Sequence, residues 1–138
     1  MSFPNALYYI NKEEMEHALN TDNPSYKKDQ LAFIRNSNQL VLINDEGKIN
    51  ECIKYSKTAA HAAHHLVFWL KENKKIIFFG GDDAPQHQQM KSKFVAKYDF
   101  DGRKSMQLRE EWWEQGKKEG WTFLFYHDIK SPIIENLQ

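Results

Sequence analysis

The pattern of apolar and polar positions predicts short strands separated by helices. Residues 6–10 form an apolar run that predicts a strand, and Asn11 followed by Glu14 supplies the N-cap and N3 pair that opens a helix to about Asn20. Residues 75–80 begin with the second of two lysines and are then almost entirely apolar, which is typical of a central strand. Residues 121–128 form a second, aromatic strand near the C-terminus.

The segment between these regions is open to two interpretations. Residues 30–55 contain three apolar or alternating runs separated by Asn-rich and Gly-containing turns, which predicts a three-stranded antiparallel meander. The competing interpretation takes Asn23-Pro24 as a helix start and extends a helix through Phe33. Residues 24–35 are therefore either helix or strand.

Residues 57–73 predict a helix by their apolar periodicity. Positions spaced at 100° place one set of residues on a broad core-facing side: Ala59, Ala62, Ala63, Leu66, Val67, Trp69 and Leu70. His61, His65 and Phe68 fall on the other side of this helix. The histidines are therefore expected to lie away from the core.

Two further helices are expected in the second half of the chain. Asp83 is placed as the N-cap of one of them, and residues 99–103 form a turn. The other helix runs from about residue 105 to 118 and stops before Gly120.

Two stretches share one plan, which sets the expected fold class. Residues 69–83 and 112–128 each run from a Trp-bearing helix through a lysine pair into an apolar strand that ends in aspartate. Repeated helix–strand units predict strands that run in parallel as neighbours. The chain is expected to be a single α+β domain over residues 1–138, with a mixed sheet of about five to six strands and about four helices.

Composition narrows the functions that this chain can perform. Nineteen basic residues balance nineteen acidic ones, so no net positive field attracts nucleic acid, which is disfavoured as a partner. Cys52 is the single cysteine, which excludes an internal disulfide and a multi-cysteine zinc site and favours a reducing, cytoplasmic setting. No run of about twenty apolar residues or export signal is present, so we expect no membrane span.

Acidic residues and a histidine follow the two predicted parallel strands. Asp82 and Asp83 come after the first strand, and His127 and Asp128 come at the end of the second. The carboxyl edge of such a sheet is where ligands bind, and these side chains suit Mg²⁺ or Mn²⁺ and the hydrolysis of a phosphate ester. Structural roles compete with this interpretation, because Asp83 could cap a helix and Asp128 could close a turn.

The histidine stretch offers a second candidate for metal binding. His61 and His65 are four residues apart, so both imidazoles could reach one metal from a helix face. A third ligand would have to come from another element, because Glu72 lies two turns beyond His65. The alternative is a solvated helix face that carries histidines without a metal.

The sequence favours a protein-binding function by elimination. No complete catalytic set is recognisable, and aromatic residues make up 14% of the chain. We expect an inhibitor, an antitoxin-like or immunity protein, or an adaptor that has no cofactor and binds an unidentified protein, with homodimerisation left open. The expected binding surface contains His61, His65, Phe68, Trp112 and Trp113. The alternative is a small metal-dependent phosphoesterase or nuclease that uses Asp82, Asp83, His127 and Asp128.

Overall fold

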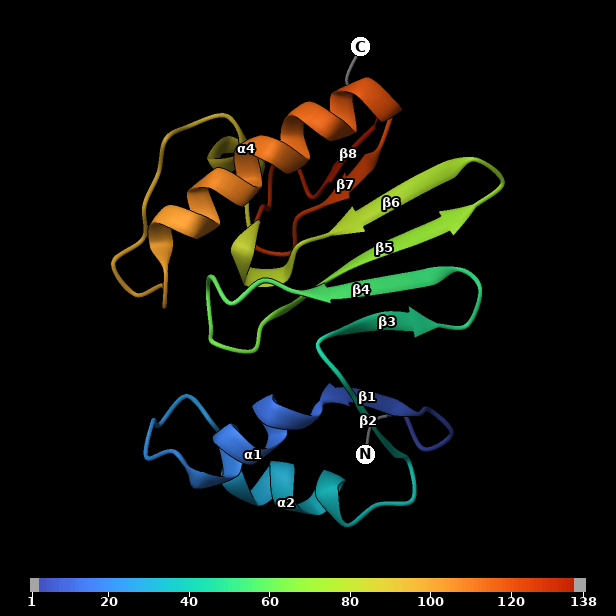
Figure 1. Ribbon diagram of the computed structural model, residues 1–138, viewed down its shortest axis with the longest axis vertical. Coiled ribbons are helices and arrows are strands. Elements are labelled where there is room, and N and C mark those ends of the chain that lie inside the picture. The colour runs from blue at the N-terminus through green and yellow to red at the C-terminus, as the bar shows by residue number, and fades with distance from the viewer. Residues whose placement is uncertain (1–2, 136–138) are drawn as a thin grey trace. The chain divides into compact units, whose positions relative to one another are not determined.

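The computed structural model describes residues 3–135 and confirms the predicted α+β class, with a mixed six-stranded sheet, a two-stranded sheet and four α-helices in these residues (Figure 1). The chain divides into two compact units, one up to Asp45 and one from Glu46. Each unit is described by itself. The expectation that residues 1–138 form a single domain stays a prediction.

The first unit contains a two-stranded parallel sheet and two helices. Its elements are β1 (Tyr8–Asn11), α1 (Lys12–Asn20), α2 (Lys28–Arg35) and β2 (Leu40–Ile43). The predicted N-cap is confirmed, because the Asn11 side chain accepts a hydrogen bond of 3.0 Å from the Glu14 N–H. Within residues 24–35, for which the sequence allows helix or strand, Lys28–Arg35 are helical.

The second unit contains the six-stranded sheet. Its strands, in their order across the sheet, are β3 (Glu46–Ile49), β4 (Ile53–Lys57), β5 (Leu66–Glu72), β6 (Lys75–Phe79), β7 (Thr122–Leu124) and β8 (Ile133–Ile134). All neighbouring pairs are antiparallel except β6 and β7, which run in parallel with Ile77 opposite Thr122. The predicted parallel pair is therefore confirmed, and the carboxyl ends of both strands lie at one edge.

Two predictions for the middle of the chain are wrong. The predicted meander is reduced to the β3–β4 hairpin, because β2 pairs with β1 in the other sheet. Residues 57–73 are a loop followed by β5 rather than a helix. In β5, Val67 and Trp69 face the core while Phe68 pairs across the sheet with Tyr55 and Phe79. The β-branched and aromatic side chains of β5 suit a strand that pairs with neighbours on both edges. This strand pairing determines the structure, although the spacing of the preceding alanines matches a helical period.

The long helix α4 (Gly102–Glu119) covers one face of this sheet (Figure 1). Asp101 caps its first turn by accepting a hydrogen bond of 3.0 Å from the Lys104 N–H, and Gly120, at φ 68°, ends it as predicted. Trp112 and Trp113 are 6% and 8% exposed and pack against Phe78 and Phe123. Their expected position on an outer surface is therefore wrong, because the sheet needs a wide apolar helix face to close its core.

Two short elements follow β6. They are the 3₁₀ turn η1 (Gly81–Asp83) and the one-turn helix α3 (His87–Met90). Asp83 lies inside η1, so it does not cap a helix as predicted, and Gln86 occupies the N-cap position of α3. Within residues 3–135 no helix is long and apolar enough to cross a membrane.

Candidate functional site

Three side chains from separate loops meet at the carboxyl edge of β6 and β7. Asp82 follows β6, His127 follows β7, and His61 comes from the loop between β4 and β5. The His127 Nε2 lies 3.5 Å from the Asp82 Oδ1, and the His61 Nε2 lies 3.7 Å from the Asp82 Oδ2. The three side chains are 57%, 26% and 38% exposed for His127, His61 and Asp82. Asp82 thus has one imidazole beside each carboxylate oxygen, at a position that solvent can reach.

A buried carboxylate fixes the orientation of His61. The His61 Nδ1 lies 2.9 Å from the Oδ1 of Asp99, whose side chain is only 2% exposed. Asp99 is held in turn because the next two backbone N–H groups, of Phe100 and Asp101, donate to the carbonyls of His61 and Ala60. The Asp99 carboxylate accepts a hydrogen bond from the His61 Nδ1–H, which leaves the Nε2 lone pair facing Asp82. Two acceptors that face each other are favourable only when a proton or a metal cation lies between them.

His65 uses both ring nitrogens inside the protein. Its Nε2 accepts a hydrogen bond of 3.2 Å from the Asp82 N–H, and its Nδ1 lies 3.2 Å from the Asp83 Oδ2. Gly81 permits this approach, because its φ is 53° and a Cβ there would lie 2.9 Å from the His65 ring. The predicted pairing of His61 and His65 on one metal therefore lacks a free nitrogen on His65.

Asp83 is fully buried and supports the site through its hydrogen bonds. Its Oδ1 accepts a hydrogen bond of 2.7 Å from the His61 N–H, and its carbonyl accepts one of 2.9 Å from Arg109. Burial raises the pKa of Asp83, but the interactions with His65 and the His61 N–H outweigh that effect and lower the pKa below its usual value. Asp83 therefore remains ionised and holds the His61 loop against η1.

Tyr126 and Asp128 flank His127 and have different roles. The Tyr126 hydroxyl donates a hydrogen bond to the Asp82 Oδ1, and burial together with this bond raises the pKa of Tyr126. Asp128 accepts hydrogen bonds from the N–H groups of His87, Lys130 and Ser131, so it shapes the loop after β7. Of the four predicted strand-end residues, the structure brings Asp82 and His127 together, places Asp83 beneath them, and uses Asp128 in a turn.

Sequence reasoning missed Asp99 and Tyr126 and assigned His61 to the wrong element. The expected turn ends at Asp101, which caps α4, because residues 102 and 103 already belong to that helix. The pattern gave no sign that Asp99 reaches back to His61.

The donor atoms suit a metal only when more ligands are added. No group of three or more His, Cys, Asp or Glu side chains in the described part of the chain is arranged to hold one ion. Imidazole nitrogens and carboxylate oxygens are nevertheless the ligands that zinc prefers after thiolates. Each oxygen of Asp82 faces a different histidine, so Asp82, His61 and His127 are the side chains of this cluster that could contribute ligands to a metal.

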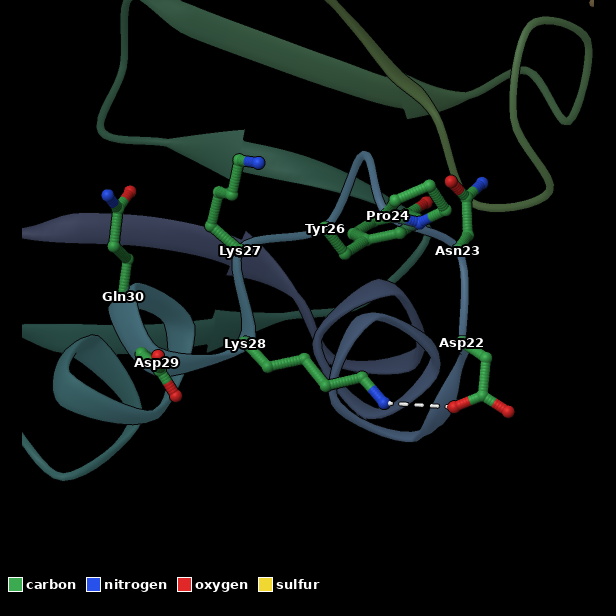
Figure 2. A pocket seen from close by; sticks show the side chains of 8 residues that line it. All are labelled: Asp22, Asn23, Pro24, Tyr26, Lys27, Lys28, Asp29 and Gln30. Carbon is green, nitrogen blue, oxygen red and sulfur yellow. Dashed lines mark hydrogen bonds and ion pairs between the residues drawn. The ribbon is translucent and has the colours of Figure 1, made fainter.

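The first unit contains a hollow of about 450 Å³ that carries little chemistry. Figure 2 shows its lining side chains: Asp22, Asn23, Pro24, Tyr26, Lys27, Lys28, Asp29 and Gln30. A single ion pair joins two of them, Lys28 and Asp22, over 3.5 Å, and the Asp22 side chain is fully exposed. None of these side chains is a histidine or a cysteine, so size does not make this hollow the better candidate site.

Comparison with known proteins identifies structures with a similar fold. No family model and no curated protein matches the sequence. A probable metal-dependent hydrolase from Staphylococcus aureus is similar in structure, with a TM-score of 0.77, 20% identity, and coverage of 96% of this chain and 48% of that one. The hydrolase AbOPH, described as a member of the beta lactamase superfamily, matches with a TM-score of 0.75 and 23% identity over 96% of this chain and 51% of its own.

A further match is AidC, described as a dizinc quorum-quenching lactonase in complex with its product. It matches with a TM-score of 0.72 and 14% identity over 95% of this chain and 51% of its own. This chain therefore spans about half the length of these structures. At these identities the similarity establishes that the chain shares the fold of about half of each hydrolase.

Proposed function

We propose that this chain forms a metal-dependent hydrolytic centre, at which Asp82, His61 and His127 would hold divalent ions. The observation that carries the proposal is the single carboxylate with an imidazole Nε2 beside each oxygen. The neighbours described as a metal-dependent hydrolase and a dizinc lactonase support the same chemistry. They favour the alternative from the sequence, a metal-dependent hydrolase, over the protein-binding inhibitor, which they do not support.

The chain's own residues would prepare the site in three ways. Asp99 keeps the proton on the His61 Nδ1 and so presents the Nε2 as a ligand. Tyr126 holds one oxygen of Asp82, and its raised pKa keeps the hydroxyl protonated as a hydrogen-bond donor. Asp83 fixes the backbone of His61. Bound there, the ions would supply Lewis acidity to the carbonyl or phosphoryl group of a substrate.

We place the substrate in the class of esters and lactones. Similar structures include an N-acyl homoserine lactone hydrolase with its product bound at the catalytic metal centre. A nuclease fits less well, because the chain has no net positive charge to attract a polyanion. The cytoplasmic setting and a protein partner, both expected from the sequence, stay predictions.

Metal binding tests this function directly, without requiring turnover. We expect the chain to bind Zn²⁺ in a calorimetric titration, His61→Ala or His127→Ala to remove part of the bound metal, and Asp82→Ala to remove nearly all of it. Asp22→Ala is the matched control, because that carboxylate is fully exposed and lies outside the cluster. Unchanged Zn²⁺ binding in Asp82→Ala would refute this metal centre.

Hydrolysis is the second measurement. N-Hexanoyl-homoserine lactone incubated with the zinc-loaded chain should be converted to the ring-opened acid, and Asp82→Ala should abolish that conversion. If the wild-type chain binds zinc at Asp82 and still does not open the lactone, the substrate class is wrong while the metal centre stands.

A further inference from the structure

A cavity of about 410 Å³ lies at the opposite end of β6 from Asp82, between the sheet and the end of α4. Its lining residues are Lys48, Glu51, Cys52, Lys54, Trp69, Lys71, Ile76, Gln115, Glu119 and Trp121. Ile76 lies near the start of β6, whereas Asp82 follows the end of that strand. The cavity is therefore separate from the candidate metal centre.

A row of directly paired residues leads from the core to this cavity. Phe78 pairs with Trp69, Trp69 with Lys54, and Lys54 with Lys48 across β6, β5, β4 and β3. Directly paired residues point to the same face of a sheet, so the row ends with two like charges side by side. Such a pair is destabilising in the absence of a counter-charge. No carboxylate in residues 3–135 forms an ion pair with Lys48 or Lys54 within 4.0 Å.

Aromatic rings form the wall beside the two lysines. The rings of Trp69 and Trp121 meet edge to face with centroids 6.4 Å apart, and the Lys54 Nζ lies 5.6 Å from the Trp69 ring centroid. Trp121 is almost fully buried, whereas Trp69 is partly exposed and forms the accessible part of the wall. A flat apolar group could stack here while a charge remains at the lysines.

Glu119 does not neutralise Lys48 and Lys54. Its carboxylate accepts hydrogen bonds from the Trp121 Nε1 at 2.9 Å and from the Gln115 Nε2 at 3.0 Å. These bonds hold the carboxylate at the end of α4. Of the three lysines in the lining, Lys71 is the one whose charge acts on Glu119. The paired lysines therefore keep a local positive charge above an aromatic wall, although Glu51 also lies in the lining.

We propose that this cavity binds a small organic anion with an aromatic body, whose carboxylate, sulfonate or phosphate group lies between Lys48 and Lys54 and whose ring contacts Trp69. This site is independent of the proposed hydrolytic function, because none of its residues belongs to the cluster around Asp82. The ligand class follows from the paired charges and the indole wall together.

The indole N–H signals of a ¹⁵N-labelled chain test the proposal. Naphthalene-2-sulfonate is the probe, because it carries the expected charge and ring and contains no bond that a hydrolase opens. The chain has four tryptophans, of which Trp69 and Trp121 line the cavity while Trp112 and Trp113 lie in the core. We expect saturable shifts at Trp69 and Trp121, and little change at Trp112 and Trp113. Shifts of equal size at all four, or none at Trp69, would disprove the site.

Two comparisons separate the contributions of charge and ring. Neutral 2-naphthol and inorganic sulfate should each bind at least roughly fivefold more weakly than the probe, since each lacks one of the two contacts. Lys54→Gln should lower the affinity for the probe by a similar factor. Lys75 is exposed and lies outside the cavity lining, so Lys75→Gln should leave this affinity unchanged. Equal affinity in Lys54→Gln and the wild type would show that the lysine pair does not hold the anion.

Discussion

His61 and His65 lie in one loop, four residues apart, and their Nε2 atoms have opposite environments. The His61 Nδ1 is backed by Asp99 and the His65 Nδ1 by Asp83, so both rings have a carboxylate behind them. The His65 Nε2 meets a backbone N–H, whereas the His61 Nε2 meets the carboxylate of Asp82. An N–H satisfies a lone pair, and a carboxylate requires a cation between the two acceptors. The comparison places His65 in the architecture of the loop and leaves His61 as the proposed metal ligand.

The largest expected effect concerns the carboxylate behind His65. Asp83→Ala removes the acceptor of the His61 N–H and the buried carboxylate that lies 3.2 Å from the His65 Nδ1, and breaking such a buried pair costs about 3–5 kcal/mol of unfolding free energy. The adjacent Asp82→Ala is the matched control and should cost about 1 kcal/mol or less without metal, because Asp82 is 38% exposed. Urea unfolding of both variants measures the difference. Equal losses would remove the distinction between the two carboxylates.

The next effect concerns His65 itself. His65→Ala should lower the free energy of unfolding by about 1–3 kcal/mol, because the Asp82 N–H loses its acceptor and the buried Asp83 carboxylate loses the imidazole beside it. The loss should be similar with and without Zn²⁺, since His65 has no free nitrogen. Urea unfolding under both conditions checks this expectation. A loss that appears only with zinc would make His65 a ligand and contradict the assignment.

The fold and the candidate site also show which features could be predicted from the sequence and which could not. The parallel pair β6–β7, the cap at Asn11 and the stop at Gly120 depend on local signals, so they were predictable from short stretches. Asp82 and His127 could then be placed at one edge. His61 could not be placed, because the periodicity of alanines imitated a helix over residues 57–73. The backing by Asp99 joins residues 38 positions apart, and no local pattern encodes such a contact.

A third histidine, His87, sharpens the comparison because it has neither kind of partner at its Nε2. Its ring lies against Trp113 and Phe125, and the buried Nε2 has no hydrogen-bond partner among the described residues. Burial, with a smaller contribution from Lys91, lowers the pKa of His87, although Asp128 opposes the shift. The unfolded chain therefore binds a proton near pH 6.5 that the folded chain binds only at lower pH.

Stability should consequently fall as the pH drops below about 6.5 and level off below the pKa of the folded state. We expect a loss of about 1 kcal/mol or less between pH 7.5 and 5.5 that His87→Leu removes, measured by urea unfolding at both pH values. The comparison between wild type and variant isolates His87 from the other histidines. An identical pH dependence in His87→Leu would show that the ring is protonated in the folded chain as easily as in the unfolded one.

The smallest expected effect on folding belongs to His61, and it decides the comparison. Without metal, His61→Ala should lower the free energy of unfolding by about 1 kcal/mol, because the Asp99 carboxylate loses its imidazole partner. Water can replace the partly exposed ring, and the backbone bond to Asp83 remains. With excess Zn²⁺ the wild type should unfold at a higher temperature, since a ligand that binds only the folded chain stabilises it. This zinc-dependent rise should be reduced in His61→Ala and retained in His65→Ala. The opposite pattern in thermal unfolding would exchange the roles of the two histidines, and with them the assignment of the open nitrogen as the metal ligand.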